Sequence, residues 1–160
     1  MATFTYIKET NQSIAAMKGL ISYCTQDKKV YDRLSENRLV GGVNCDGENA
    51  FTEFMVTKKS YNKVKGTNFY QYVQSFSPDE DITPEQVHKI GLEFAEKAWQ
   101  GHEVLVTTHS DADHLHNHFV INSVSFETGL KLNQPPNTVV KLRGLNDELC
   151  KKYGFSTLET

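Results

Sequence analysis

A helix start signal in the middle of the chain restricts the fold more than any other sequence feature. Thr83 is a favoured N-cap residue, Pro84 suits the first helical position, and Gln86 completes a capping box. An apolar stripe at helical spacing follows, and Gly101 is a plausible end. The pattern predicts a helix over residues 84–100.

Strand-like segments flank this helix on both sides. Alternating or apolar β-forming residues predict strands over 2–8, 68–76, 103–109, 116–126 and, after a hairpin turn, 130–132. Apolar residues spaced by three and four predict further helices over 11–26, 48–59 and 138–153, with loops at Gly41-Gly42 and Asp46-Gly47. We therefore expect an α+β domain with a central antiparallel sheet of about five strands and helices packed on its faces.

The length of 160 residues fits one domain over 1–160. No apolar run approaches the roughly 20 residues of a membrane span, so we expect no membrane association. The N-terminus has no signal pattern, which predicts a cytoplasmic protein. Cys24, Cys45 and Cys150 are odd in number and widely spaced, so reduced, packed cysteines are expected rather than disulfides.

The formal net charge of −3 counts against a strongly basic nucleic-acid binder. The charge is uneven, because residues 71–130 hold 2 Lys and Arg against 10 Asp and Glu. This acidic stretch contains all six histidines. The charge pattern thus indicates that a cation belongs there.

Four of the six histidines fall within residues 109–118. His116 and His118 are two apart on an expected strand, so both rings leave the same face. His109 ends the preceding strand, and a turn brings it back beside them. Three imidazoles from adjacent strands predict a metal tripod with open positions, as in a catalytic site.

Other residues near the tripod are candidates for supporting roles. Asp111 and Asp113 are candidates to accept a ring N–H from a ligand histidine. Asn122 shares the strand parity of His118 and is a candidate to contact a ligand or the substrate, and His114 stays ambiguous. His88 is expected on the surface of the 84–100 helix, and His102 is expected to be structural.

A metal tripod needs a nucleophile, which is either a metal-bound water or a side chain. No serine lies in a nucleophile-elbow motif. Tyr23 lies beside the apolar stripe of the 11–26 helix, where its ring can be buried while its hydroxyl faces a cleft. Position alone favours an ordinary boundary tyrosine.

The segment HSDADHLHNHFVIN resembles the third motif of conjugative relaxases, the mobilisation nucleases among the HUH endonucleases. The motif H-x-D-x-x-x-x-H-x-H-x-x-x-N falls on His109, Asp111, His116, His118 and Asn122. The stretch from Phe69 to this motif is also similar to the family, and AAMKGLISYCTQDKK resembles its first motif. The resemblance covers most of residues 1–130. One departure is Asn117, which occupies the usually hydrophobic position between the two motif histidines.

The resemblance implies a relaxase nuclease domain, which forms the N-terminal part of longer proteins. It implies a site- and strand-specific endonuclease that nicks single-stranded DNA at an origin of transfer through a 5′-phosphotyrosine on Tyr23. It implies a divalent metal, Mn²⁺ or Mg²⁺ with Zn²⁺, Co²⁺ or Ni²⁺ as alternatives, on His109, His116 and His118. Asp111 and His114 are both candidates to activate Tyr23. Accessory relaxosome proteins are expected partners.

Candidate DNA contacts come from two places. Ser75 and Ser77 lie in the region of the family's second motif, although turn and capping roles explain them equally well. The most basic short stretch holds Lys58, Lys59, Lys63 and Lys65, with aromatic residues interleaved and following. Basic charge with stacking rings suits single-stranded DNA, and a solvated helix end fits the lysines equally well.

Three other functions stay open. One is a rolling-circle replication initiator, which shares the chemistry. Another is a metal hydrolase that uses metal-bound water without a covalent intermediate. The third is a DNA-binding module whose metal site is structural.

Overall fold

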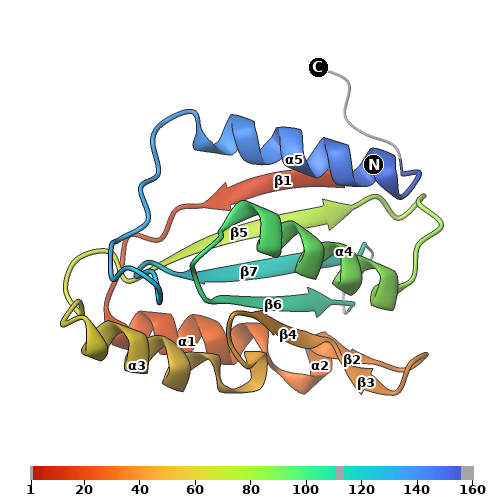
Figure 1. Cartoon of the computed structure of the whole chain (residues 1–160). Coiled ribbons are helices and arrows are strands. Elements are labelled where there is room, and N and C mark those ends of the chain that lie inside the picture. Colours follow the sequence, from red (N-terminus) through yellow and green to blue (C-terminus); the bar gives the residue numbers. More distant parts are fainter. Residues whose placement is uncertain (1, 111–113, 156–160) are drawn as a thin grey trace.

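The computed structural model describes residues 2–110 and 114–155 and has a five-stranded antiparallel sheet at its centre (Figure 1). The spatial order is β1-β5-β7-β6-β4. These strands are β1 (Ala2–Ile7), β4 (Val40–Val43), β5 (Phe69–Phe76), β6 (Val104–His109) and β7 (His116–Asn122). The expected α+β class with a five-stranded antiparallel sheet is confirmed.

Helices cover both faces of the sheet (Figure 1). On one face lie α4 (Pro84–Ala98) and α5 (Thr138–Lys152). On the other lie α1 (Ile14–Cys24) and α3 (Ala50–Ser60). Within the described residues, no helix combines the length and apolar character that crossing a bilayer requires.

The alternation of strand residues divides the core between the two faces. Phe119 is fully buried under α4 with Phe94 and Trp99, in a cluster of packed aromatic rings. Its neighbour Val120 points the other way, into a cluster with Phe54 of α3. Successive side chains of β7 therefore serve opposite layers.

The capping box predicted for α4 is present. The Thr83 side chain accepts from the Gln86 backbone N–H at 3.2 Å, and the Gln86 side chain accepts from the Thr83 N–H at 2.9 Å. At the start of α1, Ser13 caps the helix by accepting from Ala16 N–H at 3.0 Å. The α4 helix thus begins where its sequence predicts, whereas α1 begins at Ile14, three residues inside the expected span of 11–26.

The expected loop at Gly41-Gly42 is wrong, because both glycines lie in the edge strand β4. A Cβ on Gly42 would lie 2.2 Å from the Cys45 carbonyl oxygen, and one on Gly47 would lie 2.4 Å from that of Gly41. The glycines permit close backbone approach here rather than a flexible turn.

Other boundaries differ from expectation. The strand starting at His116 ends at Asn122, not at residue 126, and residues 130–132 contribute only the isolated bridge Val124–Lys131. The sequence reading also missed a short helix and ribbon, namely α2 (Asp27–Val30), β2 (Tyr31–Asp32) and β3 (Asn37–Arg38). These elements are too short to show a periodic pattern.

One end of the sheet face that carries α1 and α3 stays open. These helices pack on Phe69, Leu105 and Val120. Toward the other end, Thr3 is exposed and Ser75 is half-buried. This open end is where β6 stops and β7 begins.

Candidate metal centre

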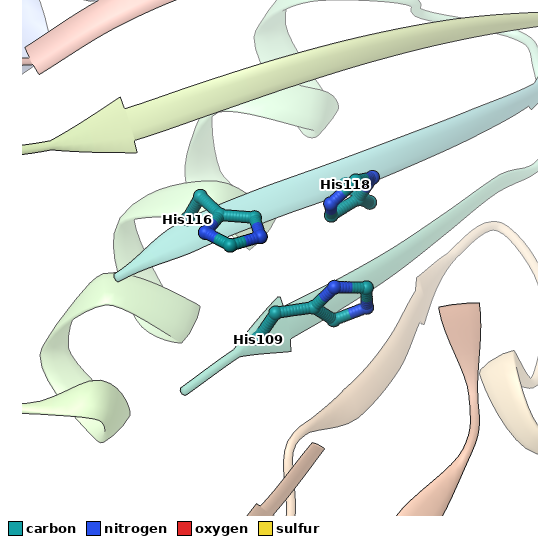
Figure 2. A group of neighbouring side chains, drawn as sticks. All are labelled: His109, His116 and His118. Carbon is teal, nitrogen blue, oxygen red and sulfur yellow. The ribbon is translucent and has the colours of Figure 1, made fainter. Parts of the chain in front are cut away.

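Three histidines converge at the open end of the sheet (Figure 2). His109 is the last residue of β6 and pairs with His116, the first residue of β7, while His118 pairs with Thr107. One nitrogen of each ring lies within 4.8 Å of the others. The structure thus brings together the three residues that the sequence selects.

Backbone carbonyls orient two of these rings. Nε2 of His109 lies 2.9 Å from the carbonyl oxygen of Cys24, so Nε2 carries the proton and Nδ1 the lone pair. Nδ1 of His116 lies 3.3 Å from the carbonyl oxygen of His114. Such contacts at one ring nitrogen fix the tautomer and direct the other nitrogen, which is typical of metal-binding histidines.

Gln71 of β5 holds the third ring, with Nε2 3.2 Å from Nδ1 of His118. Turning the amide over lets its oxygen accept from Nδ1–H instead, which leaves Nε2 of His118 as the candidate metal-binding atom. Sequence reasoning missed Gln71. Its only signal was strand parity, because it faces the same side as the histidines.

The donor set fits a divalent transition-metal ion. Three neutral imidazoles from rigid strands leave further coordination positions open, as in catalytic rather than closed structural sites. A bound cation here would also suit the acidic middle of the chain. We therefore regard His109, His116 and His118 as residues able to hold a divalent ion.

Tyr23 lies beside this triad. Its side chain is 47% exposed at the last turn of α1, and its ring meets the His109 ring edge-on with centroids 6.3 Å apart. The next residue, Cys24, supplies the carbonyl that orients His109. The same helix end therefore positions both the phenol and one candidate ligand.

Lys29 of α2 is a neighbour that sequence reasoning missed. Its Nζ lies 4.6 Å from the centroid of the Tyr23 ring, and its carbonyl accepts from Ser110 N–H at 3.0 Å. A cation over an aromatic face is attractive. The sequence shows two adjacent lysines, Lys28 and Lys29, but no sequence pattern indicates that they lie near Tyr23.

Other candidates near the site have mixed outcomes. Asp111 and Asp113 lie outside the described residues. His114 is exposed, with its ring 5.6 Å from that of His116. Ser75 pairs directly with His116 across β5 and β7. Ser77 instead accepts from Asp79 N–H at 3.2 Å, as a turn residue does.

Two of the sequence-selected DNA contacts lie in the interior. Lys58 is 0% exposed, and its Nζ donates to the Asn68 carbonyl at 2.5 Å and to Asn122 Oδ1 at 2.6 Å. Asn122 is also fully buried and donates to Glu103 Oε1 at 3.0 Å. Both residues were wrongly assigned to the DNA surface, because helical and strand periodicity alone did not show that their faces pack together.

The remaining lysines of the basic stretch lie at the opposite end of the sheet from the triad. Lys59 and Lys65 are exposed, and Lys63 donates to the Gly129 carbonyl at 2.9 Å. This stretch leads into Phe69, which pairs with Asn122, six residues along β7 from His116. At about 3.3 Å per residue, the separation is roughly 20 Å.

Fold and site together define an α+β domain with an open three-histidine centre next to a helical tyrosine. The family model "Relaxase: MobA/VirD2-like, nuclease domain" matches residues 23–155, a span that includes Tyr23 and all three histidines. The chain belongs to this family.

Several relatives are similar over most of this chain. Protein Rlx of Staphylococcus aureus is 44% identical over 117 residues, which is 73% of this chain and 35% of Rlx. The group II intron-interrupted relaxase LtrB of Lactococcus lactis subsp. cremoris is 30% identical over 194 aligned positions, covering 97% of this chain and 33% of LtrB. TraI of Escherichia coli is 28% identical over 146 residues, which is 86% of this chain and 18% of TraI. The chain spans about a third of the length of the first two relatives.

Proposed function

We propose that this chain is the nuclease domain of a relaxase that nicks one DNA strand at an origin of transfer and so initiates conjugative mobilisation. The observation that carries the proposal is the histidine triad beside Tyr23 on an open sheet face. Membership in the relaxase family supports it. An open shelf of this kind suits an extended single strand better than a duplex.

In the proposed step, the Tyr23 hydroxyl oxygen attacks the scissile phosphorus. The Tyr23 O–P bond forms and the P–O3′ bond breaks, so the DNA keeps a 5′-phosphotyrosine and the leaving oxygen becomes a free 3′-OH. The proton lost by the phenol balances the proton gained by the 3′ oxygen. Because one phosphate ester replaces another, the strand can later be rejoined.

Residues around Tyr23 have separate tasks in this scheme. His109, His116 and His118 would hold the divalent ion, Mn²⁺ or Mg²⁺, with Zn²⁺, Co²⁺ and Ni²⁺ as alternatives. When bound, the ion offsets negative charge on the non-bridging phosphate oxygens and orients the phosphate. Asp111 and His114 both remain candidates to take the phenol proton.

The DNA strand would cross the open end of the sheet. Ser75 stands directly across from His116, within reach of a phosphate bound at the triad. Lys29, beside Tyr23, adds positive charge at the same place. Lys59, Lys63 and Lys65 would contact nucleotides farther along the strand, and accessory relaxosome proteins would supply further affinity.

A gel assay tests the proposal. The protein is incubated with Mn²⁺ or Mg²⁺ and a single-stranded oligonucleotide spanning its own origin, and the products are separated under denaturing conditions. We expect a covalent protein–DNA band with the wild type and with Tyr31→Phe, a matched control because Tyr31 is similarly exposed at 45%. Tyr23→Phe should abolish the band. His116→Ala and His118→Ala should abolish nicking while DNA binding persists.

Each other outcome points to a different function. Cleavage that survives Tyr23→Phe would exclude the tyrosine nucleophile and favour a hydrolase that uses metal-bound water. Binding without cleavage in any metal would favour a DNA-binding module. Nicking at a replication origin rather than a transfer origin would favour a replication initiator.

A further inference from the structure

Asn117 lies between two candidate metal ligands in the sequence, yet its side chain points to the opposite face of the sheet. It is 0% exposed and contacts the layer under α4. The relaxase motif usually has a hydrophobic residue there. A buried amide is costly unless its donors and acceptor are all hydrogen bonded.

The Asn117 amide is bonded on every side. Its Oδ1 accepts from Thr108 Oγ1 of β6 at 2.5 Å. Its Nδ2 donates to Gln74 Oε1 of β5 at 2.9 Å and to the Val87 carbonyl of α4 at 2.8 Å. One side chain thus ties two neighbouring strands and a helix to β7.

These bonds extend in both directions. Because the Thr108 proton goes to Asn117, His88 Nδ1 donates to Thr108 Oγ1 at 2.9 Å. At the other end, Gln74 Nε2 donates to Asn146 Oδ1 at 2.6 Å. We refer to this set as the polar chain: His88, Thr108, Asn117, Gln74 and Asn146. His88 is therefore half-buried and bonded, not on the surface as the sequence suggested.

The polar chain crosses the sheet directly behind the triad. Asn117 pairs with Thr108 on one side and with Gln74 on the other. Thr108 is adjacent to His109 in sequence, and Asn117 is flanked by the other two ligands. The polar chain therefore holds β6 and β7 in register and at a fixed spacing, at the point where the opposite face of these strands presents the imidazoles.

Helix α4, which packs against the polar chain, has a glycine at a position close to the Asn117 amide. A Cβ on Gly91 of α4 would lie 2.5 Å from Asn117 Nδ2 and 2.8 Å from its Cγ. Any side chain at Gly91 would therefore displace the amide. By contrast, a Cβ on Gly144 of α5 would have no heavy atom within 4 Å.

We propose that Asn117 is a positioning residue of the metal centre, which sets the geometry of His109, His116 and His118 from the opposite face of the sheet. The inference rests on the proposed function, because it assumes that the triad holds a divalent ion. Its structural basis is the polar chain and the close approach of Gly91 to the Asn117 amide. Partners that orient ligands typically change metal affinity by about tenfold or more when removed.

Mn²⁺ binding to the full chain, measured by electron paramagnetic resonance of the free ion, tests this without any nicking assay. Asn117→Leu should lower Mn²⁺ affinity about tenfold or more, because the amide is lost. Gly91→Ala should also weaken Mn²⁺ binding. Alanine has a higher helix propensity than glycine, and this substitution leaves every residue of β6 and β7 unchanged.

Two matched controls separate positioning from general destabilisation. Asn122→Leu removes another buried amide from β7, and Gly144→Ala adds the same methyl group to a helix with space for it. Both should bind Mn²⁺ as the wild type does, with folding of every variant checked by circular dichroism. If Asn117→Leu does not fold, the Gly91→Ala result decides.

Wild-type affinity in folded Asn117→Leu or in Gly91→Ala would overturn the inference, as would an equal loss in Asn122→Leu. If the wild type binds none of the candidate ions, Mn²⁺ included, both the inference and the proposed function fail. A nicking assay gives a further distinction. Excess Mn²⁺ should restore nicking to Asn117→Leu but not to Tyr23→Phe.

Discussion

At the scale of single residues, Lys58 is an ammonium group enclosed by oxygen atoms. Besides Asn68 and Asn122, it contacts Ser123 Oγ at 3.3 Å. Burial lowers the pKa of Lys58 to about 7. Three acceptors match the three ammonium protons, so this side chain stabilises the end of the sheet opposite the triad.

Replacing Lys58 with Met should lower the free energy of unfolding by about 2–3 kcal/mol, because it leaves buried acceptors without a donor. Urea denaturation measures the change. The exposed neighbour in Lys59→Met is the control and should stay within about 0.5 kcal/mol of wild type. Equal effects of the two substitutions would contradict the buried role of Lys58.

His88 predicts a pH dependence of stability. Burial lowers its pKa from 6.5 to about 4, so between these values the unfolded chain binds a proton that the folded chain does not. The free energy of unfolding should therefore fall as the pH drops from 6.5 toward 4. In His88→Gln, where an amide can still donate to Thr108, the fall between pH 7 and pH 5 should be smaller. Urea midpoints at both pH values test this, and an unchanged fall would exclude His88 as a contributor.

At the scale of elements, α4 connects local sequence signals with the site. Its N-terminus is fixed by Thr83 and its C-terminal half by Phe94 in the aromatic core. Between them, Val87 and Gly91 face Asn117. A well-capped helix thus packs behind the strands that carry the candidate metal ligands.

Thr83→Ala should destabilise the protein by about 1 kcal/mol, since it removes the cap of α4. Thermal unfolding measures this. Thr52→Ala, at an exposed position inside α3, is the control and should have little effect, because alanine is the better helix former there. A similar loss in both variants would mean that the capping box contributes nothing specific.

At the scale of the whole molecule, the net charge of −3 means that bulk attraction to DNA is weak. A few lysines nevertheless place positive charge at particular points of the sheet. Lys29 lies at the triad, and Lys59 and Lys65 lie at the far end of the sheet. Specificity for DNA should then depend on a few contacts and on partners rather than on overall charge.

Salt titration of single-stranded DNA binding tests this arrangement. For an oligonucleotide of about six nucleotides, Lys29→Gln should reduce the slope of log K against log salt by about 0.7, and Lys65→Gln should leave it unchanged. An oligonucleotide of about twenty nucleotides reaches both ends of the sheet, so Lys65→Gln should then reduce the slope as well. A steep slope for the wild type on random sequence would contradict the weak bulk attraction. Fluorescence anisotropy provides the measurement.

Local patterns in the sequence determined the element types and the histidine triad. The capping box specified the start of α4, and strand parity placed His116 and His118 on one face. Adjacent strands of an antiparallel pair then brought His109 beside them, because register follows from the connection between them.

Only the tertiary structure decided which polar residues are buried and what they contact. Lys58, Asn117 and Asn122 sit on periodic positions like those of surface residues, and their burial depends on the layer that packs against them. The position of Lys29 over Tyr23 likewise depends on a four-residue helix with no periodic signal. Periodicity reports one element at a time, whereas burial and contacts between distant segments are set by how the elements pack.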